Sequence, residues 1–193
     1  MEHPGTLITA SNLAVHLAAV GRVDEAVVLG EETWEARRRV VGLEHPDTLS
    51  SAHNLAIRLA SVGRFDEAVV LGEETWEVQR RVVGLEHPDT LSSASNLAVH
   101  LAAVGRVDEA VVLGKDALER RRRVLGLEHP DTLSTAYNLT VDLADAGRVR
   151  EARVLAEETL ERQRRVLGED HADTRSTAGW VESLREEQQD PES

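Results

Sequence analysis

The sequence contains no cysteine, and only 3% of its residues are aromatic. Without cysteine the chain cannot form a disulfide, a thiolate zinc site or a cysteine nucleophile. With so few aromatic residues, a hydrophobic core must be built mainly from Ala, Val and Leu. That composition, together with 30% charged residues, favours packed helices over a β-sandwich. We therefore expect an all-α protein.

Long apolar runs and an excess of positive charge are also missing. No segment approaches the roughly 18 consecutive apolar residues of a membrane-spanning helix, and the segment Met1–Pro4 does not resemble the start of a signal peptide. The 35 Asp and Glu outnumber the 22 Lys and Arg, giving a net charge of −13, the wrong sign for binding a phosphate backbone. We expect a soluble cytoplasmic protein whose partners include neither membranes nor nucleic acids.

The most informative feature that is present is an internal repeat. The string Glu-His-Pro-x-Thr-Leu begins at Glu2, Glu44, Glu86 and Glu128, so its copies start 42 residues apart, and a degraded fifth copy begins at Asp170. A fixed period of this length is the signature of repeat architectures. We predict one repeat domain over residues 1–193, with repeats 2–43, 44–85, 86–127 and 128–169 and a capping helix at about 173–189.

Each repeat reads as two helices, as the second copy illustrates. His45 precedes a proline and is therefore disfavoured in a helix, whereas Pro46 suits the first helical position. Apolar residues recur three and four positions apart over Leu49–Leu59, which is typical of one buried helix face. Glycines are expected to end the two helices, at Gly63 and Gly84. One such hairpin cannot bury its own apolar face, so the copies should stack into a solenoid.

The pattern Asn-Leu-Ala-x6-Gly-Arg-x-Asp-Glu-Ala, over Asn54–Ala68 and Asn96–Ala110, resembles the tetratricopeptide repeat. The 42-residue period is similar to the long variety found in kinesin light chains and in the sensor regions of NB-ARC-type signalling ATPases. The resemblance implies an all-α, right-handed solenoid of helix-turn-helix repeats with a C-terminal capping helix. It also implies that the first helix of each repeat lines a concave groove.

Groups that could carry catalysis or bind metal occur as rows of identical copies. His45, His87 and His129 should lie about 8–10 Å from one another, the usual distance between packed helices, whereas zinc–nitrogen bonds are about 2.0–2.1 Å long. A Gly-rich phosphate loop and a His-Glu-x-x-His motif are both absent. An active site needs unlike groups converging in one cleft. We therefore predict no catalytic residue, no metal and no cofactor.

The best candidate for a binding surface is a row of asparagines in the first helices. Asn in a helix interior is roughly 0.7 kcal/mol less favourable than Ala, so its recurrence suggests a role. Its amide can donate and accept hydrogen bonds along an extended peptide backbone, and in family members the matching Asn contacts bound peptides. Alternatively, the Asn fixes the packing between repeats. The row comprises Asn12, Asn54, Asn96 and Asn138.

Two further rows should flank these asparagines. The more variable row could set specificity, chiefly through His53 and Tyr137, and comprises Ser11, His53, Ser95 and Tyr137. An apolar row lies one turn further along and comprises Val15, Ile57, Val99 and Val141. Another variable row, comprising His16, Arg58, His100 and Asp142, is expected to be exposed. Asp142 and Asp145 would add negative charge at the C-terminal end of the groove. The groove lacks the Lys and Arg that chaperone-binding relatives use to clamp a terminal carboxylate, so a strongly acidic tail is not the expected partner.

The second helices depart from the family pattern in the middle. Gly30, Gly72 and Gly114 stand where a bulky aromatic is usual, and Trp34 and Trp76 lie four residues after the first two. Because helix side chains lean toward the preceding turn, we predict that each Trp covers its Gly.

Arginines cluster at the end of each second helix, where cations meet the negative end of the helix dipole. We expect them to form i,i+4 pairs such as Glu77–Arg81 and Glu161–Arg165. The alternative is a basic stripe for an acidic partner.

These features predict a non-catalytic protein-protein interaction module that binds a peptide or partner surface in its concave groove, as the sensor part of a larger signalling protein. The alternative is a self-assembling scaffold in which repeat ends stack. The first repeat opens with Leu7, Ile8, Leu13 and Val15 and has no polar cap. Either the chain is a fragment of a longer solenoid, or a second copy covers this face and forms a homo-oligomer.

Overall fold

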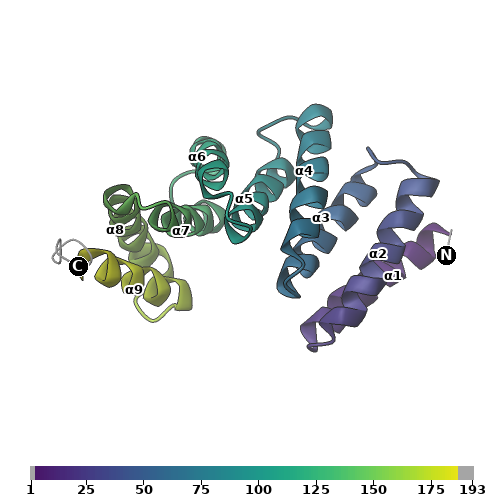
Figure 1. Ribbon diagram of the computed structural model, residues 1–193, viewed down its shortest axis with the longest axis horizontal. Coiled ribbons are helices and arrows are strands. Elements are labelled where there is room, and N and C mark those ends of the chain that lie inside the picture. Colours follow the sequence, from purple (N-terminus) through teal and green to yellow (C-terminus); the bar gives the residue numbers. More distant parts are fainter. Residues whose placement is uncertain (1–2, 187–193) are drawn as a thin grey trace. The chain divides into compact units, whose positions relative to one another are not determined.

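The computed structural model describes residues 3–186, apart from the side chain of Pro4, and within these residues it contains nine helices and no strand. The prediction of an all-α fold is confirmed. The helices follow one another with short turns and alternate between first and second helices of a repeat (Figure 1). The first helices are α1 Pro4–Ala19, α3 Pro46–Ser61, α5 Pro88–Ala103 and α7 Pro130–Asp145. The second helices are α2 Val23–Val40, α4 Phe65–Val82, α6 Val107–Val124 and α8 Val149–Leu167, and α9 is Ala172–Glu186.

The chain divides into two compact units, residues 1–100 and 101–193. In the first unit α1 packs on α2, α2 on α3 and α3 on α4. In the second unit α6 packs on α7, α7 on α8 and α8 on α9. Within each unit these helices thus pack against the next one in sequence, as expected for stacked hairpins.

The helix starts and ends have local causes. His45 is the N-cap of α3, and its ring Nδ1 accepts a hydrogen bond from the backbone N–H of Asp47 at 3.2 Å. His129 caps α7 through Asp131 in the same way. Such a bond satisfies one of the backbone donors left free at a helix N-terminus. At the other end, Gly63 has a φ of 80°, a conformation that side chains with a Cβ rarely adopt.

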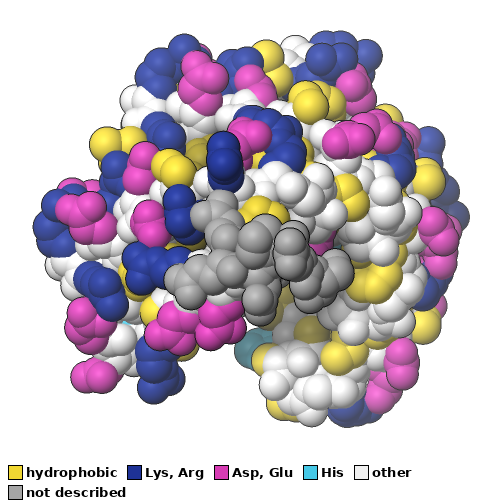
Figure 2. Space-filling view, turned by 60° about the vertical axis from the view of Figure 1, so that its left-hand side comes forward, with side chains coloured by type: hydrophobic (Ala, Val, Ile, Leu, Met, Phe, Trp, Pro, Cys, Tyr) yellow, Lys and Arg dark blue, Asp and Glu magenta, His cyan; other side chains and the backbone are white. Residues whose placement is uncertain are grey.

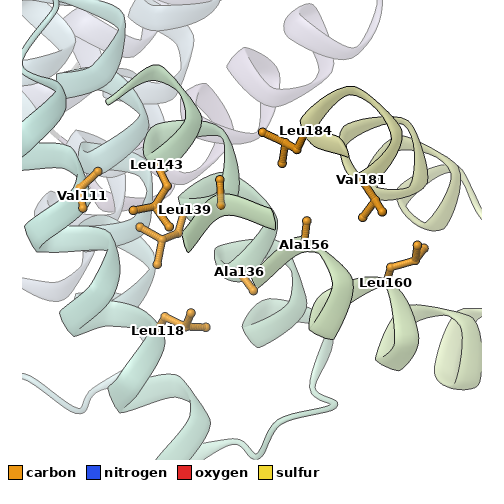
Figure 3. Packing of buried hydrophobic residues seen from close by; sticks show 10 residues of the cluster. Val111, Leu118, Ala136, Leu139, Leu143, Ala156, Leu160, Val181 and Leu184 are labelled. Carbon is orange, nitrogen blue, oxygen red and sulfur yellow. The ribbon is translucent and has the colours of Figure 1, made fainter. Parts of the chain in front are cut away.

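The core of the second unit is aliphatic, as the composition predicts. Leu139 and Leu143 of α7 belong to one buried cluster with Leu118 of α6 and Ala156 of α8 (Figure 3). Each of these four side chains is at most 4% exposed. Burying a leucine stabilises a fold by about 1.5–3 kcal/mol, so these contacts hold successive helices together.

The glycines in the second helices make room for the next repeat. An ideal Cβ built on each would lie 3.2 Å from a leucine Cδ1, in the pairs Gly30–Leu55, Gly72–Leu97 and Gly114–Leu139. The prediction that a Trp covers each Gly is therefore wrong, because the leucine of the following first helix occupies that space. Trp34 and Trp76 are instead half-buried, with Arg38 5.4 Å and Arg80 5.1 Å from their ring centroids.

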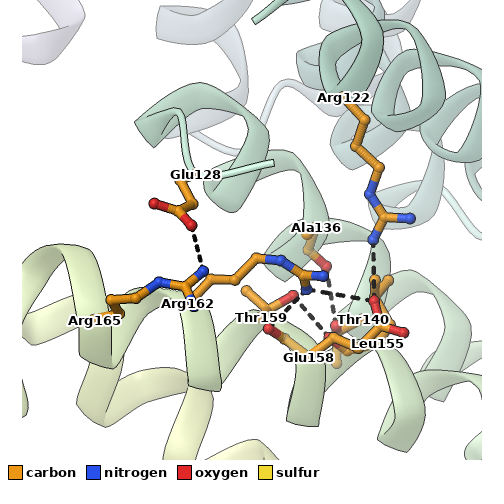
Figure 4. A network of polar contacts seen from close by, with 9 residues as sticks. All are labelled: Arg122, Glu128, Ala136, Thr140, Leu155, Glu158, Thr159, Arg162 and Arg165. Atoms are coloured by element: carbon orange, nitrogen blue, oxygen red, sulfur yellow. Dashed lines mark hydrogen bonds and ion pairs between the residues drawn. The ribbon is translucent and has the colours of Figure 1, made fainter. Parts of the chain in front are cut away.

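The arginines near the ends of the second helices pair differently from the prediction. Arg81 forms an ion pair with Glu44, and Arg165 forms one with Glu128 (Figure 4), so neither uses the glutamate four residues before it. These pairs tie the end of a second helix to the loop that precedes its first helix. Both are exposed, so each contributes at most about 1 kcal/mol.

Helix α9 has one buried face and one polar face. Thr174, Thr177, Val181 and Leu184 are buried, as are the matching residues of α7. By contrast, the 42-residue step places Arg175 and Arg185, both exposed, where α7 buries Leu133 and Leu143. A polar outer face suits a capping helix. Residues 187–189 of the predicted cap lie outside the described residues.

Candidate partner-binding surface

The asparagine row divides into exposed and half-buried members. Asn12 of α1 and Asn54 of α3 are exposed, whereas Asn96 of α5 and Asn138 of α7 are half-buried. Asn12, Asn54 and Asn96 belong to the first unit, and Asn138 to the second.

His53 connects α3 to α5 in the first unit. Its Nδ1 lies 2.9 Å from Ser93 Oγ, and its Nε2 lies 3.4 Å from Asn96 Nδ2. An amide nitrogen can only donate, so Nε2 accepts, and Nδ1 carries the ring proton and donates to Ser93. Burial lowers the pKa of His53, although the charge of Asp89 acts in the opposite direction. His53 is therefore a neutral packing residue at neutral pH.

The two roles considered for the asparagines belong to different copies. Asn96 fixes the packing of neighbouring first helices through His53. Asn12, Asn54 and Asn138 make no side-chain hydrogen bond to any other residue among 3–186, so their amides remain available to a ligand.

Apolar side chains accompany the asparagines. Ile57 is 40% exposed and Val99 is 39% exposed in the first unit, and Tyr137 and Val141 are half-buried in the second. We use the term first-helix surface for the accessible predicted residues: in the first unit Asn12, Asn54, Asn96, His53, Ile57 and Val99, and in the second Tyr137, Asn138 and Val141. Ser95 does not belong to it, since it is only 6% exposed and lies in the interior of the first unit.

The variable row expected to be exposed lies mostly between helices. His16 is exposed, but His100 and Asp142 are buried, so the expectation is wrong for these two residues. His100 and Asp142 lie opposite Gly72 and Gly114, respectively. In this row, variation reflects the packing of successive repeats.

Burial perturbs the titration of both buried members of that row. Burial raises the pKa of Asp142 to about 6, with a further contribution from the charge of Asp145. Its Oδ2 atom has no hydrogen-bond partner among the described residues. The pKa of His100 is lowered, first by burial and then by the charge of His53.

Sequence reasoning missed two buried arginines. The Arg37 guanidinium donates to the backbone oxygen of Asp47 at 2.9 Å and to Ser51 Oγ at 2.5 Å. Arg121 repeats these contacts with Asp131 and Thr135. The signal was available, because this position alternates Arg, Gln, Arg and Gln at 37, 79, 121 and 163, whereas the next position is Arg in all four repeats. These arginines fix the start of the following first helix.

Other kinds of site find no support in the part of the chain that is described. Residues 3–186 contain no group of three His, Asp or Glu side chains arranged to hold a metal ion. None of their helices combines the length and the apolar character needed to cross a membrane. On the face drawn in Figure 2, basic and acidic side chains are interspersed, and no broad patch of one sign dominates it.

Comparison with protein families identifies the repeats. Models described as tetratricopeptide repeat match residues 6–47, 48–89 and 89–163. No curated protein matches the chain significantly.

Solved structures match nearly the whole chain. The nearly identical TPR-like repeats of a Podosopora anserina protein assigned to the kinesin light chains are 30% identical to it, with a TM-score of 0.85 over 99% of this chain and 90% of that one. BtubC from P. vanneervenii is 20% identical, with a TM-score of 0.66 over 97% of this chain and 66% of that one. MamA from Desulfovibrio magneticus is 10% identical, with a TM-score of 0.60 over the full length of both chains. The last two likenesses concern the fold alone.

Proposed function

Since the chain belongs to the tetratricopeptide repeat family, whose members are generally non-catalytic interaction or scaffold modules, we propose that it binds an extended peptide through its first-helix surface. Asn54 would hydrogen-bond to the peptide backbone, and Ile57 would contact an apolar side chain of the peptide. Asn138, with Val141, would offer the same pair of groups in the second unit. The proposal includes a role as the sensor part of a larger signalling protein.

The observation that carries the proposal is the exposed side chain of Asn54, which is unpaired within residues 3–186. It lies in the interior of helix α3, where asparagine is unfavourable, and it is exposed with no hydrogen-bond partner among the described residues. Packing in the first unit therefore does not account for it. A backbone amide of a bound peptide would supply both the donor and the acceptor that the side chain lacks.

A peptide-array screen followed by affinity measurements tests this proposal. The best peptide should bind the Asn12→Ala plus Asn54→Ala variant at least about tenfold more weakly, the loss expected from removing two or so hydrogen bonds of about 1 kcal/mol each. Ser176→Ala plus Ser183→Ala, two exposed changes on α9, is the matched control and should leave the affinity unchanged. Equal binding by both variants would contradict the proposal.

A second candidate function is self-association through α1. Leu13 is 49% exposed, whereas its copies Leu55 and Leu97 are each 2% exposed. Val15 and Ile8 of the same helix are also exposed, at 51% and 53%. We propose that a second copy covers this apolar face. Because the described outer face of α9 carries Arg175 and Arg185 in place of buried leucines, this candidate is a closed dimer through two α1 helices.

Light scattering over a wide concentration range distinguishes the two candidates. A dimer that Leu13→Glu converts to a monomer would support self-association, because a charge would have to be buried in the interface. Glu182→Leu, an apolar change at an exposed position of α9, is the control for non-specific hydrophobic association. A strict monomer at millimolar concentration would contradict the second candidate and leave the peptide-binding proposal intact.

A further inference from the structure

Each unit carries a groove between two successive second helices. In the first unit the groove lies between α2 and α4, has a volume of about 420 Å³, and has an apolar floor formed by Trp34, Leu55, Leu59, Val70 and Leu71. In the second unit the groove lies between α6 and α8 and has a volume of about 560 Å³. None of the residues that line either groove belongs to the first-helix surface.

The two grooves are copies of one another, offset by two repeats. Most positions are conserved between them: for example, Glu35 corresponds to Glu119 and Glu74 to Glu158. Arg38 reaches Glu74 at 3.7 Å, just as Arg122 reaches Glu158 at 3.5 Å (Figure 4). Three matching positions differ, and they are Glu31 and Lys115, Trp34 and Leu118, and Asp66 and Arg150.

These differences change the charge around the groove. Three cations and three carboxylates line the groove of the second unit. Only carboxylates supply the charge in the lining of the first unit's groove, and they are Glu31, Glu35, Asp66, Glu67 and Glu74. We call this site the acidic groove.

Neighbouring arginines neutralise only part of this charge. Arg64 pairs with Glu31 at 2.9 Å and with Glu67 at 2.5 Å, and Arg38 pairs with Glu74. Within the described residues, Glu35 and Asp66 have no ion-pair partner. Five carboxylates against two cations leave a net charge of about −3 around an apolar floor.

We propose that the acidic groove binds a basic amphipathic segment of a partner protein. An apolar side chain of the segment would lie on the floor beside Trp34, and Lys or Arg side chains would pair with Glu35 and Asp66. The volume suits a few side chains. The apolar floor beside Trp34 would supply most of the affinity, and the carboxylates would supply selectivity for basic segments and speed of association. The groove of the second unit, which is lined by three cations and three carboxylates, would not share this selectivity.

The test replaces residues of the acidic groove by those at the matching positions of the second unit. The fold already accommodates these residues there. Glu31→Lys plus Asp66→Arg gives the acidic groove the charge pattern of its copy, and Trp34→Leu gives it the floor of its copy. Glu182→Lys plus Glu186→Arg changes the net charge by the same amount at exposed positions of α9 and serves as the matched control. The probe is a fluorescein-labelled peptide with Leu and Lys at helical spacing, compared with its Leu and Glu counterpart.

Fluorescence anisotropy at physiological salt should show that the protein prefers the Lys peptide by at least about tenfold. Glu31→Lys plus Asp66→Arg should abolish that preference, and Trp34→Leu should weaken binding of the Lys peptide while keeping the preference. The control should stay within about threefold of the original affinity. The inference is overturned if the control weakens binding as much as the groove variant does, if the groove variant binds unchanged, or if the protein shows no preference.

Discussion

At the scale of single residues, Asp142 is the clearest case of a charged group buried in an unfavourable environment. It is 3% exposed, and its Oδ2 has no hydrogen-bond partner among the described residues. Burial disfavours the charged form and raises the pKa to about 6. Near neutral pH the carboxylate is therefore ionised at a cost to the free energy of unfolding.

The sign of the pH dependence follows from the pKa values. The carboxyl titrates at about 6 in the folded chain and near 3.8 in the unfolded one, so between these values the folded chain binds more protons. Stability should therefore fall as the pH rises from about 4 to about 6. The penalty is at most about 3 kcal/mol for a shift of about two units, and relaxation around the charge should reduce it to about 1–2 kcal/mol.

Asp142→Asn should remove this penalty. We expect the free energy of unfolding to rise by about 1–2 kcal/mol at pH 7.5 and to change little at pH 4, as measured by urea denaturation across the pH range. Asp145→Asn, at an exposed position one turn later, should have a much smaller effect. Parallel pH curves for Asp142→Asn and the unaltered protein would refute this assignment.

At the scale of helices, the stack depends on a small residue facing a large one. In the first three repeats a glycine of the second helix lies against a leucine of the next first helix. In the fourth repeat Ala156 replaces the glycine and Val181 the leucine, and both are buried in the same core cluster. The combined volume of the two side chains changes little between a Gly–Leu pair and the Ala156–Val181 pair. This indicates that the spacing of the helices is maintained.

A double-mutant cycle tests this complementarity. Gly72→Ala gains about 1 kcal/mol of helix propensity, but its Cβ would lie 3.2 Å from Leu97 Cδ1, so the net change should be near zero or destabilising. With Leu97→Val also present, Gly72→Ala should become stabilising, giving a favourable coupling of about 1 kcal/mol. Thermal unfolding supplies the measurement, and additive effects would argue against the contact.

The bounds of these helices follow from local sequence, whereas their contacts do not. Pro46 starts α3, and Gly63, at positive φ, follows its end, because proline and glycine act through their own backbone. The contact between Gly72 and Leu97 depends on two residues in different repeats, and the tryptophan four positions from the glycine suggested another partner. The burial of Asp142 was missed for the same reason.

At the scale of the whole molecule, repetition makes the residues of each surface predictable but not their roles. The row of Asn54 and its copies was found from spacing alone, yet only the structure separates Asn96, which packs against His53, from the exposed Asn54. The two second-helix grooves also look alike in sequence, yet two of the three positions at which they differ change their charge. The role of a residue depends on its exposure and on the residues that it contacts, and these differ between copies of the repeat.

The central claim is that a peptide binds through the asparagine amides of the first-helix surface. Asn12, Asn54, Asn96 and Asn138 are the only asparagines in the chain, so their side-chain signals in a ¹⁵N–¹H NMR spectrum report on this row directly. Adding a peptide selected on the array should shift the signal of Asn54 most and that of Asn96, which is bonded to His53, least. Saturable binding of the peptide that leaves all four asparagine signals unmoved would contradict the claim.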